Sequence, residues 1–230
     1  MNRVASANTV GMLTLACVAA SLVGLVAVGG LARQLGVESL RTVASAHTST
    51  GSRVKQGAGM YGNPSAAAVY WRPQHGGDCG EMAVADVVGQ VSGKEPTERQ
   101  IIALAESTPS TTDSGPIYRP RRGTDIRDLP VLLTHYGIRS TLAPSSIGGL
   151  EQDLAQAHKV IASVNAETIW NQGGNRNADD HVVVVTGIDA NAGVVHLNDS
   201  GIRTGRDEKV SLATFERAWG TGHNFAVVTS

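Results

Sequence analysis

Three residues whose side chains could together perform thiol chemistry follow one another in the order Cys79, His181 and Asp199. Cys79 lies in the segment QHGGDCG, His181 begins the run HVVVVTGID, and Asp199 ends the run VVHLND. A cysteine, a histidine and a carboxylate can supply a nucleophile, a general base and a group that orients the base. The chemistry that these residue types suggest is attack on a carbonyl carbon by a thiolate.

The residues around Cys79 predict a helix that begins at this cysteine. Asp78 is expected to cap the helix with its carboxylate, and Glu81 stands where a capping box requires an acid. One apolar face is predicted by four valines at helical spacing, Val84, Val87, Val88 and Val91. A thiolate at the first helical residue would be stabilised by the free backbone N–H groups and the helix dipole. The alternative is a buried structural cysteine, because free cysteines are among the most buried residues.

His181 and Asp199 are expected on the two strands of a β-hairpin. If its turn is centred on Asn191, antiparallel pairing places Val183 opposite Asp199. His181 shares a strand face with Val183, so the imidazole and the carboxylate would meet diagonally, whereas a shift of one residue would separate them. Because neighbouring residues point to opposite faces, only one of Asn198 and Asp199 can orient His181, and we favour Asp199.

The remaining patterns predict helices first and antiparallel strands later, which indicates an α+β domain. Helices are expected at 97–106, 125–136, 147–158 and 212–219, and further strands at 159–166 and 224–228. Pro130 fits the helix expected at 125–136 only if it lies in the first turn.

The ordered set of motifs resembles the papain-like cysteine peptidases, and more closely the bacteriocin-leader, or double-glycine, peptidase family and its stand-alone relatives. The pieces that carry the resemblance are the segment from Gln74 to Gly80, GTDIRDLPVLLTHYGI, HVVVVTGID, VVHLNDSG and VSLATFERAWG, within residues 68–229. The resemblance implies a papain-like fold in which N-terminal helices pack on an antiparallel sheet. It implies these roles: Cys79 as nucleophile, His181 as general base and acid, Asp199 as its orienter and Gln74 as an oxyanion donor. Gln74 precedes the cysteine by five residues, one fewer than is usual in papain-like enzymes.

We therefore expect a cysteine peptidase that hydrolyses peptides or proteins and needs no cofactor. Two alternatives are a cysteine amidase or endopeptidase acting on cell-wall peptides, and a catalytically silent peptide-binding module of the same fold. The formal net charge of −1 gives no sign of nucleic-acid binding. Metal binding is not indicated either, because neither HExxH nor paired CxxC spacing occurs.

The N-terminal residues predict a membrane attachment. Residues 9–32 contain no charged side chain and are long enough to span about 30 Å of hydrocarbon as a helix. We expect a signal-anchor or signal peptide at 1–32, a flexible tether at 33–66 and the peptidase domain at 67–230. The domain would then be secreted, or lie outside the cytoplasmic membrane on a single-pass anchor.

Overall fold

The computed structural model describes residues 59–230 of the chain. The membrane segment expected within residues 1–32, and the tether up to residue 58, lie outside the described residues. Among the helices of residues 59–230, none combines the length and the hydropathy that a bilayer crossing requires.

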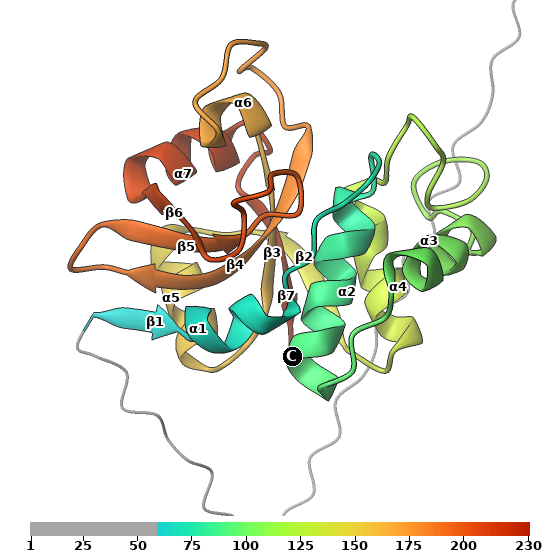
Figure 1. Cartoon of the computed structure of the whole chain (residues 1–230), viewed down its shortest axis with the longest axis horizontal. Helices are drawn as coiled ribbons and strands as arrows, with labels where there is room; N and C mark the ends of the chain where they lie inside the picture. The colour runs from blue at the N-terminus through green and yellow to red at the C-terminus, as the bar shows by residue number, and fades with distance from the viewer. Residues whose placement is uncertain (1–58) are drawn as a thin grey trace, which may run out of the picture. The chain divides into compact units, whose positions relative to one another are not determined.

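The described chain builds an antiparallel sheet with helices on both sides, an α+β fold (Figure 1). The strands follow the order β2-β7-β3-β4-β5-β6, and β1 pairs with the end of β4. Their bounds are β1 (Met60–Gly62), β2 (Ser140–Pro144), β3 (Val160–Val164), β4 (His181–Asp189), β5 (Val194–Asn198), β6 (Glu208–Ser211) and β7 (Phe225–Thr229). The helices are α1 (Pro64–Ala67), α2 (Cys79–Ser92), α3 (Glu98–Ser107), α4 (Leu129–His135), α5 (Ile147–Ala155), α6 (Ala166–Ile169) and α7 (Leu212–Gly220), with short 3-10 turns η1 (Ala68–Tyr70) and η2 (Ile126–Asp128).

Strand β4 lies at the centre of the sheet, and its valines separate two hydrophobic cores. Val182 and Val184 pack with α2, α3 and α4 on one face, whereas Val183 and Val185 pack with α5 and α7 on the other. A strand buried on both faces needs an uninterrupted apolar run, which explains the sequence VVVV. Figure 1 shows the result as a helical lobe (α2, α3 and α4) beside a sheet lobe (the strands with α5, α6 and α7).

Helix α2 begins at Cys79, as the sequence predicts, but its capping is different. The predicted capping box is wrong: Asp78 makes no side-chain cap and accepts a hydrogen bond from the Gly76 N–H (2.9 Å), while Glu81 accepts one from the Thr124 hydroxyl. A true capping box instead begins α3, with Thr97 and Gln100. Asp78 therefore binds within its own loop, two residues back, whereas the partner of Glu81 lies 43 residues away and could not be found from local spacing.

The apolar face predicted for α2 is buried except at its end. Val84, Val87 and Val88 lie in the core, whereas Val91 is 51% exposed. In the helix predicted at 125–136, η2 leads into α4, and Pro130 occupies the first turn of α4, where its missing N–H leaves no partner unpaired.

The folded part of the chain begins before residue 67. Residues 60–66, which the sequence assigned to a flexible tether, form β1 and most of α1. Met60, Tyr61 and Gly62 pair with the end of β4 at Asp189, Ile188 and Gly187. A strand of three residues is too short to show the alternating pattern from which strands are predicted. It is recognised only through its pairing with β4.

The hairpin of β4 and β5 contains a bulge between Val185 and Gly187. On the side of the bulge that leads to His181, Val184 pairs with Asn198 and Val185 with Leu197, which is the predicted register. On the turn side, Gly187 pairs with His196, which is one residue away from that register.

Candidate active site

Cys79 stands half-buried at the first position of α2, next to the core of the helical lobe. Gly80 and the rest of the first two helical turns are buried, so the position of the thiol is fixed by the packing of α2 on β4, α3 and α4. The thiol therefore stands at the end of α2 where the first backbone N–H groups have no partner within the helix.

His181 faces the site from the first residue of β4 and is almost fully buried. Its Nε2 lies 2.7 Å from Oδ1 of Asp199, which follows the end of β5. This contact leaves Nδ1 as the ring nitrogen available to the thiol of Cys79. The hairpin therefore brings together the imidazole and the carboxylate that stand 18 residues apart in the chain.

Asp199 accepts hydrogen bonds from three residues in addition to His181. Its Oδ1 also accepts from the Gly201 N–H (2.7 Å), its Oδ2 accepts from Nε1 of Trp170 (2.8 Å), and its backbone carbonyl accepts from Nε1 of Trp71 (2.6 Å). The carboxylate has no exposed surface. An acid held in this way can fix the orientation and the tautomer of the imidazole.

The protonation of the pair follows from its surroundings. Burial opposes a charge on His181, but the hydrogen bonds and negative charges of Asp199 and Cys79 outweigh it and raise its pKa to about 10. Burial opposes a charge on Asp199 as well, yet the hydrogen bond and positive charge of His181, with the donors Trp170 and Gly201, lower the pKa of the acid. At neutral pH the pair is an imidazolium beside a carboxylate.

Asn198 points away from this pair. Its side-chain amide donates to Oδ2 of Asp86 (2.7 Å) and to the carbonyl of Ala67 (2.9 Å). These contacts tie β5 to α2 and α1 beneath the site. Of the two adjacent residues considered for orienting His181, the structure brings Asp199 to the imidazole and takes Asn198 elsewhere.

Gln74 lies in the loop before α2 and lines the cleft that also contains Cys79 and His181. Its Oε1 accepts from the Ser200 hydroxyl (2.7 Å), and its Nε2 donates to the Gly76 carbonyl (2.7 Å). The backbone N–H of Gln74 donates to the Ser200 carbonyl (2.9 Å). The amide is thus held between the nucleophile loop and the residue after Asp199, with one N–H of Nε2 still available.

A cleft of about 600 Å³ opens between the two lobes and contains Cys79, His181, Gln74 and Trp170 in its lining. Gly201 packs tightly under the imidazole, because a Cβ at this position would lie 2.7 Å from the Trp170 ring and 3.0 Å from His181 Cε1. Any larger residue at 201 would displace the ring that the acid orients.

Sequence reasoning missed the two tryptophans that hold Asp199. The signal that could have found Trp71 and Trp170 is the indole N–H, which needs an acceptor when it is buried. The Trp170 ring also covers His181, with ring centroids 5.1 Å apart. Within residues 59–230, no group of three or more His, Cys, Asp or Glu side chains has an arrangement that could hold a metal ion.

Comparison with known proteins gives one family and one fold. Residues 68–227 match the Peptidase_C39 like family. Uncharacterised proteins of Mycobacterium tuberculosis and Mycobacterium bovis are each 46% identical to the chain over 197 residues, which cover 74% of this chain and 84% of each relative. The structure of a presumed C39-like peptidase from Bacillus anthracis has a TM-score of 0.57 at 16% identity, over 74% of this chain and 97% of that one.

Proposed function

Because the chain belongs to the Peptidase_C39 like family, we propose that it is a cysteine peptidase with Cys79 as its nucleophile. The family supports a cysteine-peptidase-like function, and the catalytic use of the named residues is our inference. The observation that carries it is the hydrogen-bonded pair of His181 and Asp199, which shares one cleft with a half-buried thiol at a helix N-terminus.

In the proposed reaction, the Sγ of Cys79 attacks the carbonyl carbon of a peptide bond. His181 gives a proton to the departing nitrogen and then takes one from the water that hydrolyses the thioester. Asp199 holds the imidazole and stabilises its positive charge. The N–H of Cys79 and the free N–H of Gln74 Nε2 are the proposed donors to the oxyanion, and each such donor is typically worth about 10²–10³ in rate.

The test compares the two cysteines of the chain. Cys79→Ala should reduce peptide hydrolysis by about 10⁴-fold or more, because no other group can form the thioester. Cys17→Ala removes the other thiol, which lies outside the described residues, and should leave hydrolysis unchanged. Equal activity in the Cys79→Ala protein would end the proposal. Both purified proteins are compared with the unmodified chain on a mixed peptide library.

A silent peptide-binding module of the same fold is the outcome that must be separated from a peptidase. Thiol labelling separates them, because a thiolate beside an imidazolium reacts with iodoacetamide faster near neutral pH than an ordinary thiol does. Slow labelling together with peptide binding would identify a module. Whether the peptides come from proteins or from the cell wall is decided by the library and not by the thiol chemistry.

The proposal includes a location outside the cytoplasmic membrane. It rests on the uncharged apolar run of residues 9–32, which is long enough to act as a signal or a single-pass anchor. In an oxidising compartment Cys79 would have no intramolecular partner among residues 59–230, where it is a free thiol.

A further inference from the structure

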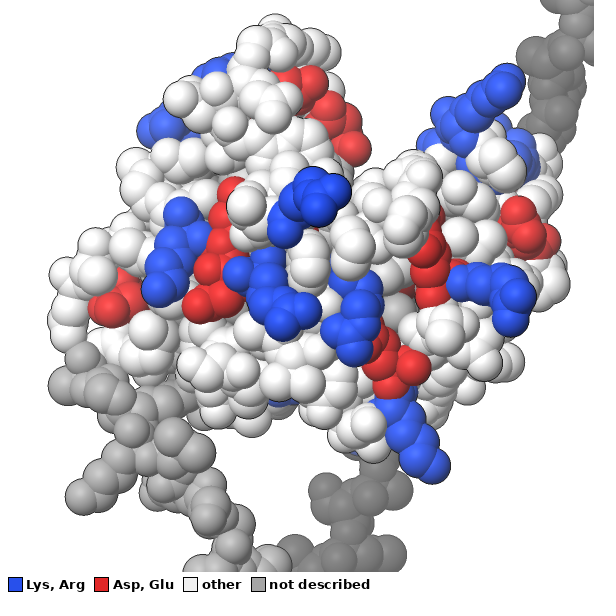
Figure 2. Space-filling view, in the orientation of Figure 1, with Lys and Arg blue, Asp and Glu red and all other residues white. Residues whose placement is uncertain are grey.

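The two walls of the cleft carry opposite charges. On the helical lobe, the loop between α3 and η2 contributes Arg121 and Arg122 to the lining. On the sheet lobe, the lining contains three carboxylates, those of Glu167, Asp179 and Asp180. Figure 2 shows the hollow between the lobes, with acidic side chains on its α6 side and basic side chains at the tip of the facing loop. A substrate in the cleft would lie between these walls.

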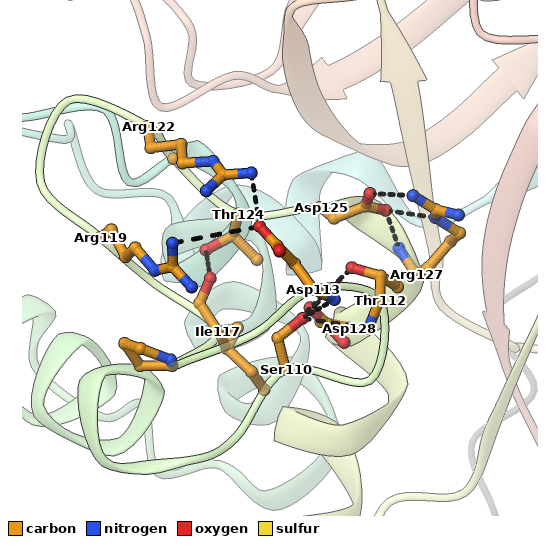
Figure 3. A pocket seen from close by; sticks show the side chains of 12 residues that line it. Ser110, Thr112, Asp113, Ile117, Arg119, Arg122, Thr124, Asp125, Arg127 and Asp128 are labelled. Atoms are coloured by element: carbon orange, nitrogen blue, oxygen red, sulfur yellow. Dashed lines mark hydrogen bonds and ion pairs between the residues drawn. The ribbon is translucent and has the colours of Figure 1, made fainter. Parts of the chain in front are cut away.

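On the helical-lobe wall, three arginines, Arg119, Arg122 and Arg127, are matched in number by the carboxylates of Asp113, Asp125 and Asp128, so the excess of positive charge comes from Arg121. Arg119 and Arg122 both approach the single carboxylate of Asp113, while Arg127 pairs with Asp125 (Figure 3). These residues line a side pocket of about 300 Å³, and the two linings share the residues 122–125. The side pocket therefore adjoins the cleft at these residues.

Arg121 is the cleft residue best placed to meet a negative charge. Among the described residues, no ion pair or hydrogen bond of its side chain occurs. Its backbone has φ of 71°, in the left-handed region that side chains rarely adopt, within a turn closed by N–H groups of Arg122 and Gly123 on the Arg119 carbonyl. The turn thus holds an unpaired guanidinium at the cleft in a conformation that the chain does not favour on its own.

The acidic wall has hydrogen bonds but no basic partner within the described residues. Asp179 accepts from the Ser163 hydroxyl, and Asp180 accepts from the Ala166 N–H (2.9 Å). Glu167 accepts only a longer hydrogen bond, from the Asn165 amide (3.2 Å). Burial is the main cause that raises the pKa of Asp180, and the negative charge of Glu167 raises it further, while the charge of the neighbouring His181 opposes the rise.

The direction of a bound peptide follows from the proposed chemistry. The leaving nitrogen must receive its proton from His181, so the C-terminal part of the substrate would depart past the sheet lobe, where Asp180 directly precedes His181. The acyl part would then lie toward the loop of Arg121. This loop borders the nucleophile segment, because a Cβ on Gly123 would lie 3.3 Å from the Gly77 carbonyl.

We propose that the cleft selects peptides by the order of their charges. An acidic residue N-terminal to the cleaved bond would face Arg121, and a basic residue C-terminal to it would face Glu167, Asp179 and Asp180. This selection rests on the proposed peptidase function and assigns its substrate class, which is peptides with an acidic-to-basic charge order around the cleaved bond.

The test uses the full-length chain and quenched fluorescent peptides of one core sequence. One peptide carries Glu before and Lys after the cleaved bond, a second carries them in reverse, and a third is neutral. The first should be cleaved with a kcat/KM about 10-fold above that of the second, because each favourable contact between partly exposed charges contributes a few-fold. In about 0.5 M salt the ratio should fall toward unity, since the contacts are solvent-accessible.

Charge reversal locates the selection. Arg121→Glu and, separately, Glu167→Lys should each reduce the ratio by about 5-fold. Arg139→Glu makes the same charge change on an exposed residue outside the cleft lining and should leave the ratio unchanged. Glu167→Gln gives a milder change and a smaller reduction if the lysine variant does not fold. A ratio that is unity or inverted in the unmodified enzyme, or unaffected by both cleft variants, would overturn the proposal.

A binding measurement distinguishes this proposal from the peptidase function itself. The Cys79→Ala chain should bind the first peptide more tightly than the second in fluorescence anisotropy. If no peptide is cleaved but this preference is found, hydrolysis fails and charge selection stands. If peptides are cleaved and bound without regard to charge order, hydrolysis stands and charge selection is overturned.

Discussion

Glu81 offers a measurable link between the nucleophile helix and pH. It lies on α2 two residues after Cys79 with no exposed surface, and its Oε2 has no hydrogen-bond partner among the described residues. Burial is the main cause that raises its pKa, outweighing the hydrogen bond from Thr124, from an ordinary 4.5 to about 7. The folded protein therefore keeps a proton on this acid that the unfolded chain releases.

The sign and size of the effect follow from linkage. Below pH 4.5 the acid is protonated in both states and has no pH-dependent effect on the free energy of unfolding. As pH rises toward 7 the unfolded chain ionises first, so the folded state is progressively destabilised, and above 7 the loss is complete. A pKa difference of this size corresponds to about 3 kcal/mol, an upper value because water can enter near the acid.

Replacing the acid by its neutral isostere isolates this contribution. Glu81→Gln keeps an acceptor for Thr124 and removes the ionisation, so it should change the free energy of unfolding little at pH 4. At pH 8 it should stabilise the protein by about 2–3 kcal/mol. Urea unfolding followed by circular dichroism between pH 4 and pH 8 measures the difference.

The control is Glu216→Gln, which neutralises an exposed glutamate on α7 and should give no pH-dependent difference. If Glu81→Gln changed the free energy of unfolding equally at every pH, burial would not be perturbing the acid. A greater stability of the unmodified protein at pH 8 would refute the linkage argument directly.

Three further predictions concern the hairpin and the location of the domain. Asp199→Ala should slow peptide hydrolysis by about 10⁴-fold, because the carboxylate that orients His181 is lost. Asn198→Ala should act mainly on stability, because it removes a hydrogen bond to Asp86. Hydrolysis rates and urea midpoints of both variants test this ranking, and the reverse ranking would contradict it. Asp199→Asn keeps the shape of the side chain but removes the negative charge that helps to raise the pKa of His181 to about 10. The alkaline fall of kcat/KM should therefore move from near pH 10 to lower pH. A pH profile that did not move would assign the fall to another group. Protease added to intact spheroplasts should digest residues 47–230, and protection until lysis would place them in the cytoplasm.

Sequence patterns predicted the helix of the nucleophile because its signals are local. Valines at helical spacing indicate the apolar face of α2, of which Val84, Val87 and Val88 are buried. The start at Cys79 was predicted from Asp78 and Glu81, and it is correct although their capping box does not form. The partner of Glu81 could not be predicted from the sequence, since Thr124 comes from a loop 43 residues away. An acid three residues after Asp78 can complete a capping box or can be buried against a loop, and the local sequence is the same in both cases. The packing of the loop that contains Thr124 decides which role Glu81 takes.

The hydrogen bonds that the two tryptophans donate to Asp199 could not be predicted from the sequence either. Trp71 and Trp170 lie 128 and 29 residues away from the acid that they bind, and nothing in the spacing of these residues relates them. Trp71 is buried and Trp170 is partly buried, and composition does not indicate where their N–H groups bind. Functional groups are often positioned by contacts between residues that lie far apart in the chain. Such contacts cannot be predicted from the local patterns of a single sequence.

The hairpin shows how a local prediction can depend on an irregularity that it did not include. Near the turn, the pairing of Ile188 with Val195 is one residue away from the register expected from a turn at Asn191. Continued along the strand, that pairing would place His181 and Asp199 on opposite faces. The bulge between Val185 and Gly187 adds one residue to β4 and restores the expected pairing before the site is reached. The meeting of imidazole and carboxylate therefore depends on the bulge as much as on the alternation of the strands, and the extra residue is part of what positions the site.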